Sequence, residues 1–123
     1  MSKTLYLPLK AKWYEMIESG VKTEEYREIK PYWIQRLTRY GDNEHLNGVL
    51  YAKFLTSSPM VLQYNIDKGV MCFADYTQVK FSYGYTRRTM IFEIESITIG
   101  KGIPEWGAPD KKVYIIKLGR RVA

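Results

Sequence analysis

Cysteine and histidine are nearly missing from this chain of 123 residues, which has one of each. Cys72 cannot form an internal disulfide, and no CxxC pair or Cys/His cluster could hold zinc, so we expect a reducing compartment, no metal and no other cofactor. The sequence has no run of about eighteen apolar residues, and residues 1–16 contain no apolar stretch of signal-peptide length. These absences predict a cytoplasmic protein with no membrane partner.

Linkers, internal repeats and low-complexity stretches are missing too, which predicts a single domain over residues 1–123. Hydrophobic residues make up 46% and charged residues 26% of the chain, a composition typical of globular proteins that bury a core. The only histidine, His45, has no evident Ser or Cys partner, so we expect it on the surface and not in a catalytic triad.

The chain is basic, with a formal net charge of +6 and a pI near 9.4. A surplus of cations favours polyanionic partners over acidic proteins or bare membranes. The eleven tyrosines add side chains whose hydroxyl lets them sit at the rim of a binding groove. A basic run near the carboxyl end forms either ordinary solvated surface or an edge that faces phosphate, and it consists of Lys111, Lys112, Lys117, Arg120 and Arg121.

The chain opens with a predicted strand and a predicted helix. Residues 4–9 alternate apolar and polar side chains, and Pro8 places this strand at an edge or end of the sheet. A helix is expected over about residues 10–19, with Gly20 as its left-handed cap and a buried face formed by Trp13, Met16 and Ile17.

A second strand and a second helix follow. Residues 24–29 alternate as a strand, in which Glu25 and Arg27 share one face. Pro31 suits the first turn of a helix, because its fixed φ is helical and its missing N–H costs nothing there. The buried face of this helix is expected to consist of Trp33, Ile34 and Leu37.

The rest of the chain supplies most of the sheet. Residues 79–85 alternate as a strand that ends in a turn, and residues 113–118 are apolar on both faces, which places them deep in the sheet. Near Glu95 and Ser96 the apolar positions change from even to odd, which predicts a β-bulge that bends its strand. In residues 41–75 the apolar runs are too short and irregular to distinguish a helix from a strand, so we predict only mixed structure there. The predicted fold is α+β: a small mixed β-barrel with two N-terminal helices packed against it.

The side chains best suited to catalysis or ligand binding are concentrated between residues 20 and 27. Lys22 falls in a helix-to-strand turn, from which a flexible ammonium can reach the mouth of a cleft. Glu25 and Arg27 project on a common side, close enough to pair with each other or to hold a ligand between an acceptor and a bidentate donor. A structural salt bridge and a ligand site are both consistent with this pattern.

A second cluster surrounds the turn at residues 83–88. Tyr85, Arg87 and Arg88 combine an aromatic ring with two cations, the side chains that stack on bases and bind phosphate. Tyr83 is expected in the core by alternation, as are Trp13 and Trp33 by their helical positions. Trp106 lies in a Gly/Pro-rich loop, where it either plugs the end of the barrel or stacks on a base.

The octet Gly20-Val21-Lys22-Thr23-Glu24-Glu25-Tyr26-Arg27 resembles the GxKxxExR signature of ASCH domains, small β-barrels of the PUA-like superfamily. Other stretches in the same order resemble the compact bacterial and phage branch of that family: KWYEMIESG, KPYW, the YGY turn before MIFE, IGKGIPEWGAP and VYIIKLGR. The resemblance covers residues 4–40 and 76–121, and residues 41–75 form a longer, atypical connection.

This resemblance implies a domain that binds RNA or a modified nucleotide, with Gly20, Lys22, Glu25 and Arg27 beside a cleft. We add Tyr85, Arg87 and Arg88 to the predicted binding residues on their side-chain chemistry.

Some ASCH branches are enzymes, either ribonucleases or amidohydrolases that remove acyl groups from N4-acylated cytidine. The resemblance implies that such a hydrolase would use Lys22 and Glu25, with Glu93 or Glu95 as a downstream acid. The amidohydrolases have a threonine where this chain has Glu25, so their catalytic set is not intact here. A third interpretation is a protein-interaction barrel, suggested by the many tyrosines and the atypical segment 41–75.

Overall fold

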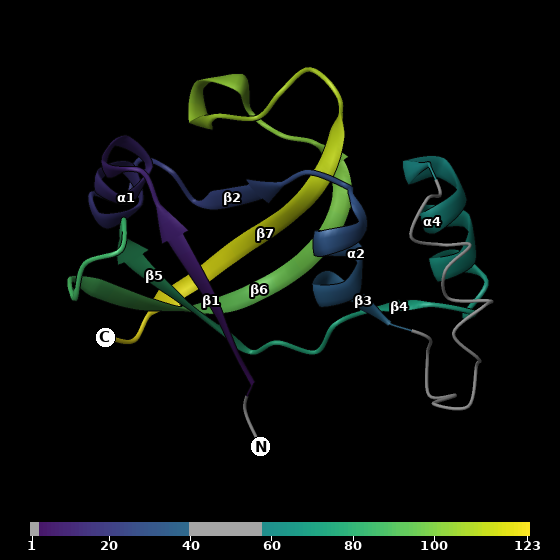
Figure 1. The fold of residues 1–123 in the computed structure, drawn as a ribbon, viewed down its shortest axis with the longest axis horizontal. Helices are drawn as coiled ribbons and strands as arrows, with labels where there is room; N and C mark the ends of the chain where they lie inside the picture. The colour runs from purple at the N-terminus through teal and green to yellow at the C-terminus, as the bar shows by residue number, and fades with distance from the viewer. Residues whose placement is uncertain (1–2, 40–57) are drawn as a thin grey trace.

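A curled five-stranded sheet organises the protein (Figure 1). The computed structural model describes residues 3–39 and 58–123. β1 runs parallel to β5 and every other pairing in the sheet is antiparallel, so the sheet is mixed. Across the sheet, the order is β1 (Thr4–Leu9), β5 (Gln78–Tyr83), β6 (Thr89–Lys101), β7 (Lys112–Arg121) and β2 (Glu24–Arg27).

The predicted edge strand is confirmed in β1. Its leucines Leu5, Leu7 and Leu9 are buried, whereas Tyr6 and Pro8 point away from the core. A proline cannot donate to a ladder, so an edge strand such as this one accommodates it without losing a central hydrogen bond. β2 forms the opposite edge of the sheet.

The curl of the sheet depends on an irregularity in β6. The β6–β7 register shifts between Phe92 and Ile94 and again between Ile94 and Ser96, where the sequence predicts a bulge. Such a shift bends the strand and increases its twist, and Figure 1 shows β6 and β7 as long curved strands. β7 lies between β6 and β2, and Val113 and Ile116 are fully buried, so its predicted deep position is confirmed.

The helices contribute side chains to the same core as the sheet. In α1 (Ala11–Glu18), Tyr14 and Ile17 are buried, and Gly20 has the expected positive φ of 86° after the helix. Trp13 was predicted in the core, but it is only half-buried. Tyr14 takes the core position instead, one residue further around the helix, where its ring makes an edge contact with Tyr83 at 5.3 Å between centroids.

The second predicted helix is confirmed as α2 (Pro31–Leu37), with Ile34 and Leu37 fully buried. Trp33, predicted in the core, packs against it but keeps part of its surface open. No helix in the described ranges combines the length and the apolar character that crossing a membrane requires.

The segment 41–75, predicted as mixed structure, is described only from Ser58 onward, and His45 lies outside the described residues. The described part contains α4 (Pro59–Asp67) and β4 (Cys72–Phe73), which pairs with β3 (Thr38–Arg39). Ser58 caps α4 by accepting a hydrogen bond from the Val61 N–H at 3.3 Å, and Pro59 starts the helix. Ser followed by Pro is a helix start signal, and it marks the beginning of α4 within a segment for which only mixed structure was predicted.

The predicted strand over residues 79–85 is two residues too long. β5 ends at Tyr83 because Gly84 adopts a φ of 58°, and Tyr85 is then 97% exposed in the turn. A short 3-10 helix, η1 (Pro104–Trp106), follows β6 and ends at Gly107, where φ is 98°.

Gly102, just after β6, is expected to tolerate no side chain. A Cβ built there would lie 2.6 Å from Cζ of Tyr26 and 2.7 Å from Cβ of Ala108. Gly102→Ala should therefore lower the free energy of unfolding by about 1–3 kcal/mol through overpacking. Gly100→Ala is the control, since its Cβ would meet only Ile115 at 3.4 Å, and a change within about 0.5 kcal/mol is expected. Urea denaturation of both variants measures the difference, and equal losses would contradict the prediction.

Candidate functional site

The two edge strands of the sheet border a cleft of about 290 Å³, which we call the edge cleft. β1 contributes Pro8 and Leu9, and β2 contributes Glu25, Tyr26 and Arg27. The remaining lining comes from the start of α1 and from the end of η1, and consists of Lys10, Trp13, Trp106 and Gly107. Segments distant in the sequence therefore meet in this one cleft.

Lys22 is the most buried charged group of the site. After Gly20 the chain folds back, and the Lys22 N–H donates to the Met16 carbonyl at 3.0 Å. The side chain then points inward and is only 1% exposed. The predicted position at the mouth of the cleft is therefore wrong, because the ammonium lies beneath the cleft. Its Nζ lies 3.1 Å from Glu25 Oε1 and donates to the Trp106 carbonyl. It also lies 4.8 Å from the ring centroid of Trp13 and 4.9 Å from that of Tyr26.

Burial lowers the pKa of Lys22 below its ordinary value, because the charged form is removed from water. The Glu25 carboxylate opposes this effect through its charge and its hydrogen bond, while the nearby Arg27 charge adds to the lowering. The ammonium is thus enclosed by groups that favour a cation, namely a carboxylate, a carbonyl oxygen and two aromatic faces.

Glu25 joins the two cations of the site. Its Oε1 accepts from Lys22 and from the Tyr26 N–H at 3.1 Å, and its Oε2 lies 2.9 Å from Arg27. The prediction that Glu25 and Arg27 lie close enough to pair is confirmed. With both oxygens occupied and the side chain buried, Glu25 acts as a positioning residue for the Arg27 guanidinium.

Arg27 spans the gap between the edge strands. It donates to its neighbour's carbonyl, that of Tyr26, at 2.7 Å and to the Pro8 carbonyl of β1 at 3.4 Å. Its guanidinium carbon lies 5.2 Å from the ring centroid of Trp33. The side chain is 17% exposed, so part of this fixed guanidinium faces solvent.

Tyr26 points to the other side of β2 and fixes the loop that carries Trp106. Its hydroxyl donates to Glu24 Oε1 at 2.7 Å and accepts from the Ile103 N–H at 3.0 Å. Burial raises the pKa of this phenol above its ordinary value, and the bond to Glu24 adds to the rise. The loop is also held at Gly107, where a Cβ would meet the Trp13 ring at 2.8 Å. Only glycine permits both this approach and the positive φ.

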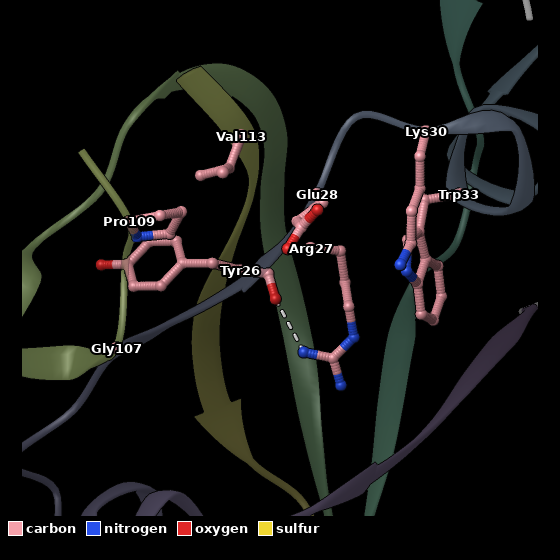
Figure 2. Close-up of a pocket in the computed structure, with 8 residues that line it drawn as sticks. All are labelled: Tyr26, Arg27, Glu28, Lys30, Trp33, Gly107, Pro109 and Val113. Atoms are coloured by element: carbon pink, nitrogen blue, oxygen red, sulfur yellow. Dashed lines mark hydrogen bonds between the residues drawn. The ribbon is translucent and has the colours of Figure 1, made fainter. Parts of the chain in front are cut away.

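A second hollow of about 350 Å³ adjoins the edge cleft, and Figure 2 shows the residues that line it. The figure shows the Arg27 side chain between Tyr26 and Trp33, with the guanidinium directed away from Glu28. Lys30 extends beside Trp33. Arg27, Tyr26 and Gly107 line both hollows, so Arg27 is accessible from more than one side.

The structure brings together three of the seven predicted binding residues: Lys22, Glu25 and Arg27. Gly20 caps α1 and is exposed outside the lining of the edge cleft. Tyr85 lines a neighbouring hollow together with Pro8 and Arg27.

The two arginines of the turn differ in their contacts. Arg88 pairs with Glu18 at 2.7 Å and lies over the rings of Tyr14 and Tyr83, whereas Arg87 is exposed in the turn. The tryptophans are the lining residues that sequence reasoning missed. This holds for Trp13 and Trp33, whose helical positions predict core burial, because helical spacing does not separate a buried ring from one at the rim. Trp106, for which stacking on a base was one of two alternatives, also lines the edge cleft.

The acidic candidates Glu93 and Glu95 are engaged elsewhere. Glu93 pairs with Arg120 at 3.1 Å and Glu95 with Lys117 at 3.5 Å, and neither lines the edge cleft. Lys111 pairs with Glu28 at 3.4 Å, so acidic partners neutralise three members of the carboxyl-terminal basic run.

Comparisons with protein-family models, with curated proteins and with solved structures found no match to this chain. The assignment of a function therefore depends on the residues and geometry of the site itself.

We predict that Glu25→Gln strongly destabilises the fold. The substitution keeps the shape of the side chain but leaves the Lys22 and Arg27 cations together without an anion, which should cost about 3–5 kcal/mol of unfolding free energy. Glu95→Gln is the matched control, because it breaks an exposed pair with Lys117, and it should cost less than about 1 kcal/mol. Urea denaturation at pH 7 compares the two, and similar losses would argue against a buried carboxylate that organises the site.

The loss in Glu25→Gln should shrink as the pH rises from 7 towards 10. Between the lowered pKa of Lys22 and its ordinary value of 10.5, the unfolded chain binds more protons than the folded chain, so unfolding free energy rises with pH. Removing the carboxylate lowers the pKa of Lys22 further and widens this window to lower pH. Urea unfolding curves of the parent protein and of Glu25→Gln between pH 7 and 10 test this prediction. A difference in unfolding free energy that stays constant with pH would contradict it.

Proposed function

We propose that this chain is an ASCH-type domain of the PUA-like superfamily that binds RNA or a modified nucleotide and receives one base in the edge cleft. The observation that carries the proposal is the Arg27 guanidinium, held by Glu25 and partly exposed in a cleft that two tryptophans line. The curled mixed sheet is consistent with the barrel-like scaffold that the ASCH resemblance implies.

The aromatic lining supports a flat ligand. Trp13 and Trp106 are both half-buried, so each ring is anchored while part of its surface stays open to the cleft. Stacking of a base on such a ring contributes about 1–3 kcal/mol to the binding free energy, whichever base it is. At about 290 Å³ the cleft is at the small end of ligand pockets, which suits a single base better than a larger molecule.

The polar side of the cleft supports an anionic, base-bearing ligand. A guanidinium has five N–H donors, and three acceptors contact Arg27 within the described chain: Glu25, Tyr26 and Pro8. Donors therefore remain for the acceptors of a base or for a phosphate. Lys10, exposed at the cleft, adds a second cation.

The hydrolase alternative draws less support from this geometry. Its lysine, Lys22, is enclosed and engaged with Glu25 and Trp106, whereas a general base has to come within hydrogen-bond reach of the substrate. The protein-interaction alternative draws on the exposed apolar side chains of α4, Met60, Val61 and Tyr64, and it gives the edge cleft no role.

Tryptophan fluorescence gives a direct test, because all three tryptophans of the chain line the edge cleft or the hollow beside it. Titration with AMP, CMP, GMP and UMP at low salt should quench the emission in a saturable way for at least one of them. Trp13→Leu should weaken that binding by about 5- to 150-fold, the equivalent of one stacked base. Circular dichroism establishes that the variant is folded.

Two arginine variants control for the charge. Arg27→Gln should weaken nucleotide binding, whereas Arg120→Gln, which removes an exposed arginine paired with Glu93, should leave it unchanged. If none of the four nucleotides quenches the emission, or if both arginine variants bind like the parent protein, a base does not occupy the edge cleft.

A further inference from the structure

Two more hollows continue from the edge cleft along β1 and over α2. The first, of about 520 Å³, shares Pro8 and Arg27 with the edge cleft. The second, of about 220 Å³, shares Tyr6, Tyr32 and Trp33 with the first. Because each hollow shares residues with the next, they form one path away from the edge cleft, which we call the β1–α2 groove.

Exposed aromatic rings follow one another along this groove. Tyr85 is 97% exposed at one end, and Tyr6 and Tyr32 are exposed further along, with Tyr32 at 52%. Large exposed aromatic side chains grouped in one groove are typical of a binding surface.

The central rings are held in place by their neighbours. Tyr32 makes an edge contact with Trp33 at 4.7 Å between centroids, and the Arg36 guanidinium lies 3.5 Å from the centre of the Tyr32 ring. Arg36 also donates to the Tyr32 carbonyl at 3.0 Å. This arrangement orders a stacking platform before any ligand binds, which reduces the entropic cost of binding.

The groove is also positively charged. Arg27, Lys30 and Arg36 line it, and no aspartate or glutamate within residues 3–39 and 58–123 does. Lys30 and Arg36 make no ion pair with an acidic residue of the described chain, in contrast to Lys111, Lys117 and Arg120 of the carboxyl-terminal run. Lys30 and Arg36 therefore leave positive charge at the groove that can attract a polyanion.

We propose that the β1–α2 groove binds the nucleotides adjacent to the base in the edge cleft, so that the ligand is a single-stranded nucleic acid and not a free mononucleotide. Successive aromatic faces interleaved with cations match a strand whose bases are open for stacking, whereas a duplex hides the faces of its bases. An acidic peptide would use the cations but has no flat groups for the rings. The inference rests on the proposed function, because the edge cleft supplies the first base.

A length series of oligouridylates tests the inference. The hexamer of uridylate should bind at least about tenfold more tightly than UMP, because it adds stacked bases and phosphate contacts. The double variant Tyr32→Ala/Arg36→Gln should lose most of this gain and still bind UMP like the parent protein. Both side chains are exposed, so the fold should tolerate their replacement.

The chain offers a matched control on α4. Tyr64 is 61% exposed, and Lys68 lies 5.6 Å from its ring centroid, so the double variant Tyr64→Ala/Lys68→Gln removes a similar cation–aromatic pair away from the groove. This control variant should bind the hexamer more tightly than UMP by the same factor as the parent protein. Hexathymidylate as a second probe shows whether the strand is RNA or DNA, and binding of either kind supports the inference.

The outcomes separate the groove from the cleft. If UMP binds and the hexamer binds no more tightly, the groove does not bind a strand and the proposed function stands. The same conclusion follows if the hexamer gains as much affinity over UMP in the Tyr32/Arg36 variant as in the parent protein. If the hexamer binds through Tyr32 and Arg36 although no mononucleotide binds, the groove stands and the edge cleft is not a base site. A hexaglutamate that competes as well as the hexamer, or a duplex that binds as tightly, would overturn the proposal of a single strand.

Discussion

The carboxylate of Glu25 holds together the parts from which the edge cleft is built. It neutralises Lys22, which comes from the turn after α1 and binds the carbonyl of Trp106, and it fixes Arg27, which reaches across to Pro8 of β1. One anion therefore links a turn, a loop and both edges of the sheet. Without it, two cations would share a site that excludes most water, and the walls of the cleft would lose their common anchor.

A buried ionic cluster is an expensive way to join these segments, since an apolar cluster of the same volume would hold them at least as well. An apolar cluster, however, could not orient a guanidinium. Glu25 and the Tyr26 carbonyl hold one nitrogen of Arg27 and the Pro8 carbonyl accepts from another, while the side chain lines three hollows. The cost of burying charge is consistent with a site that needs a fixed cation at its surface.

The sequence predicted the strands and helices that form this site better than it predicted which of their side chains are buried. Alternation placed Glu25 and Arg27 on one face of a strand, and the phase change in β6 located the bulge, because both follow from the two-residue period of a strand. Periodicity could not tell that Tyr14 and not Trp13 enters the core, since adjacent helical positions differ by less than a third of a turn. Nor could it show that Lys22 turns inward, because that depends on Glu25 and Trp106, and Trp106 joins the site only through tertiary structure.

The unclosed edge of the sheet explains why proline, charge and a covering loop occur together at this place. An exposed edge strand is open to pairing with other chains, and proteins limit this with proline, charge and covering loops. Here Pro8 withholds an N–H from β1, Arg27 binds the Pro8 carbonyl, and the loop with Trp106 and Gly107 covers the opening near Trp13. These protective residues are also the lining of the edge cleft. The side chains that block strand addition are therefore the same ones to which we assign the proposed binding of a flat anionic ligand, and Arg27 lines both the edge cleft and the groove along β1.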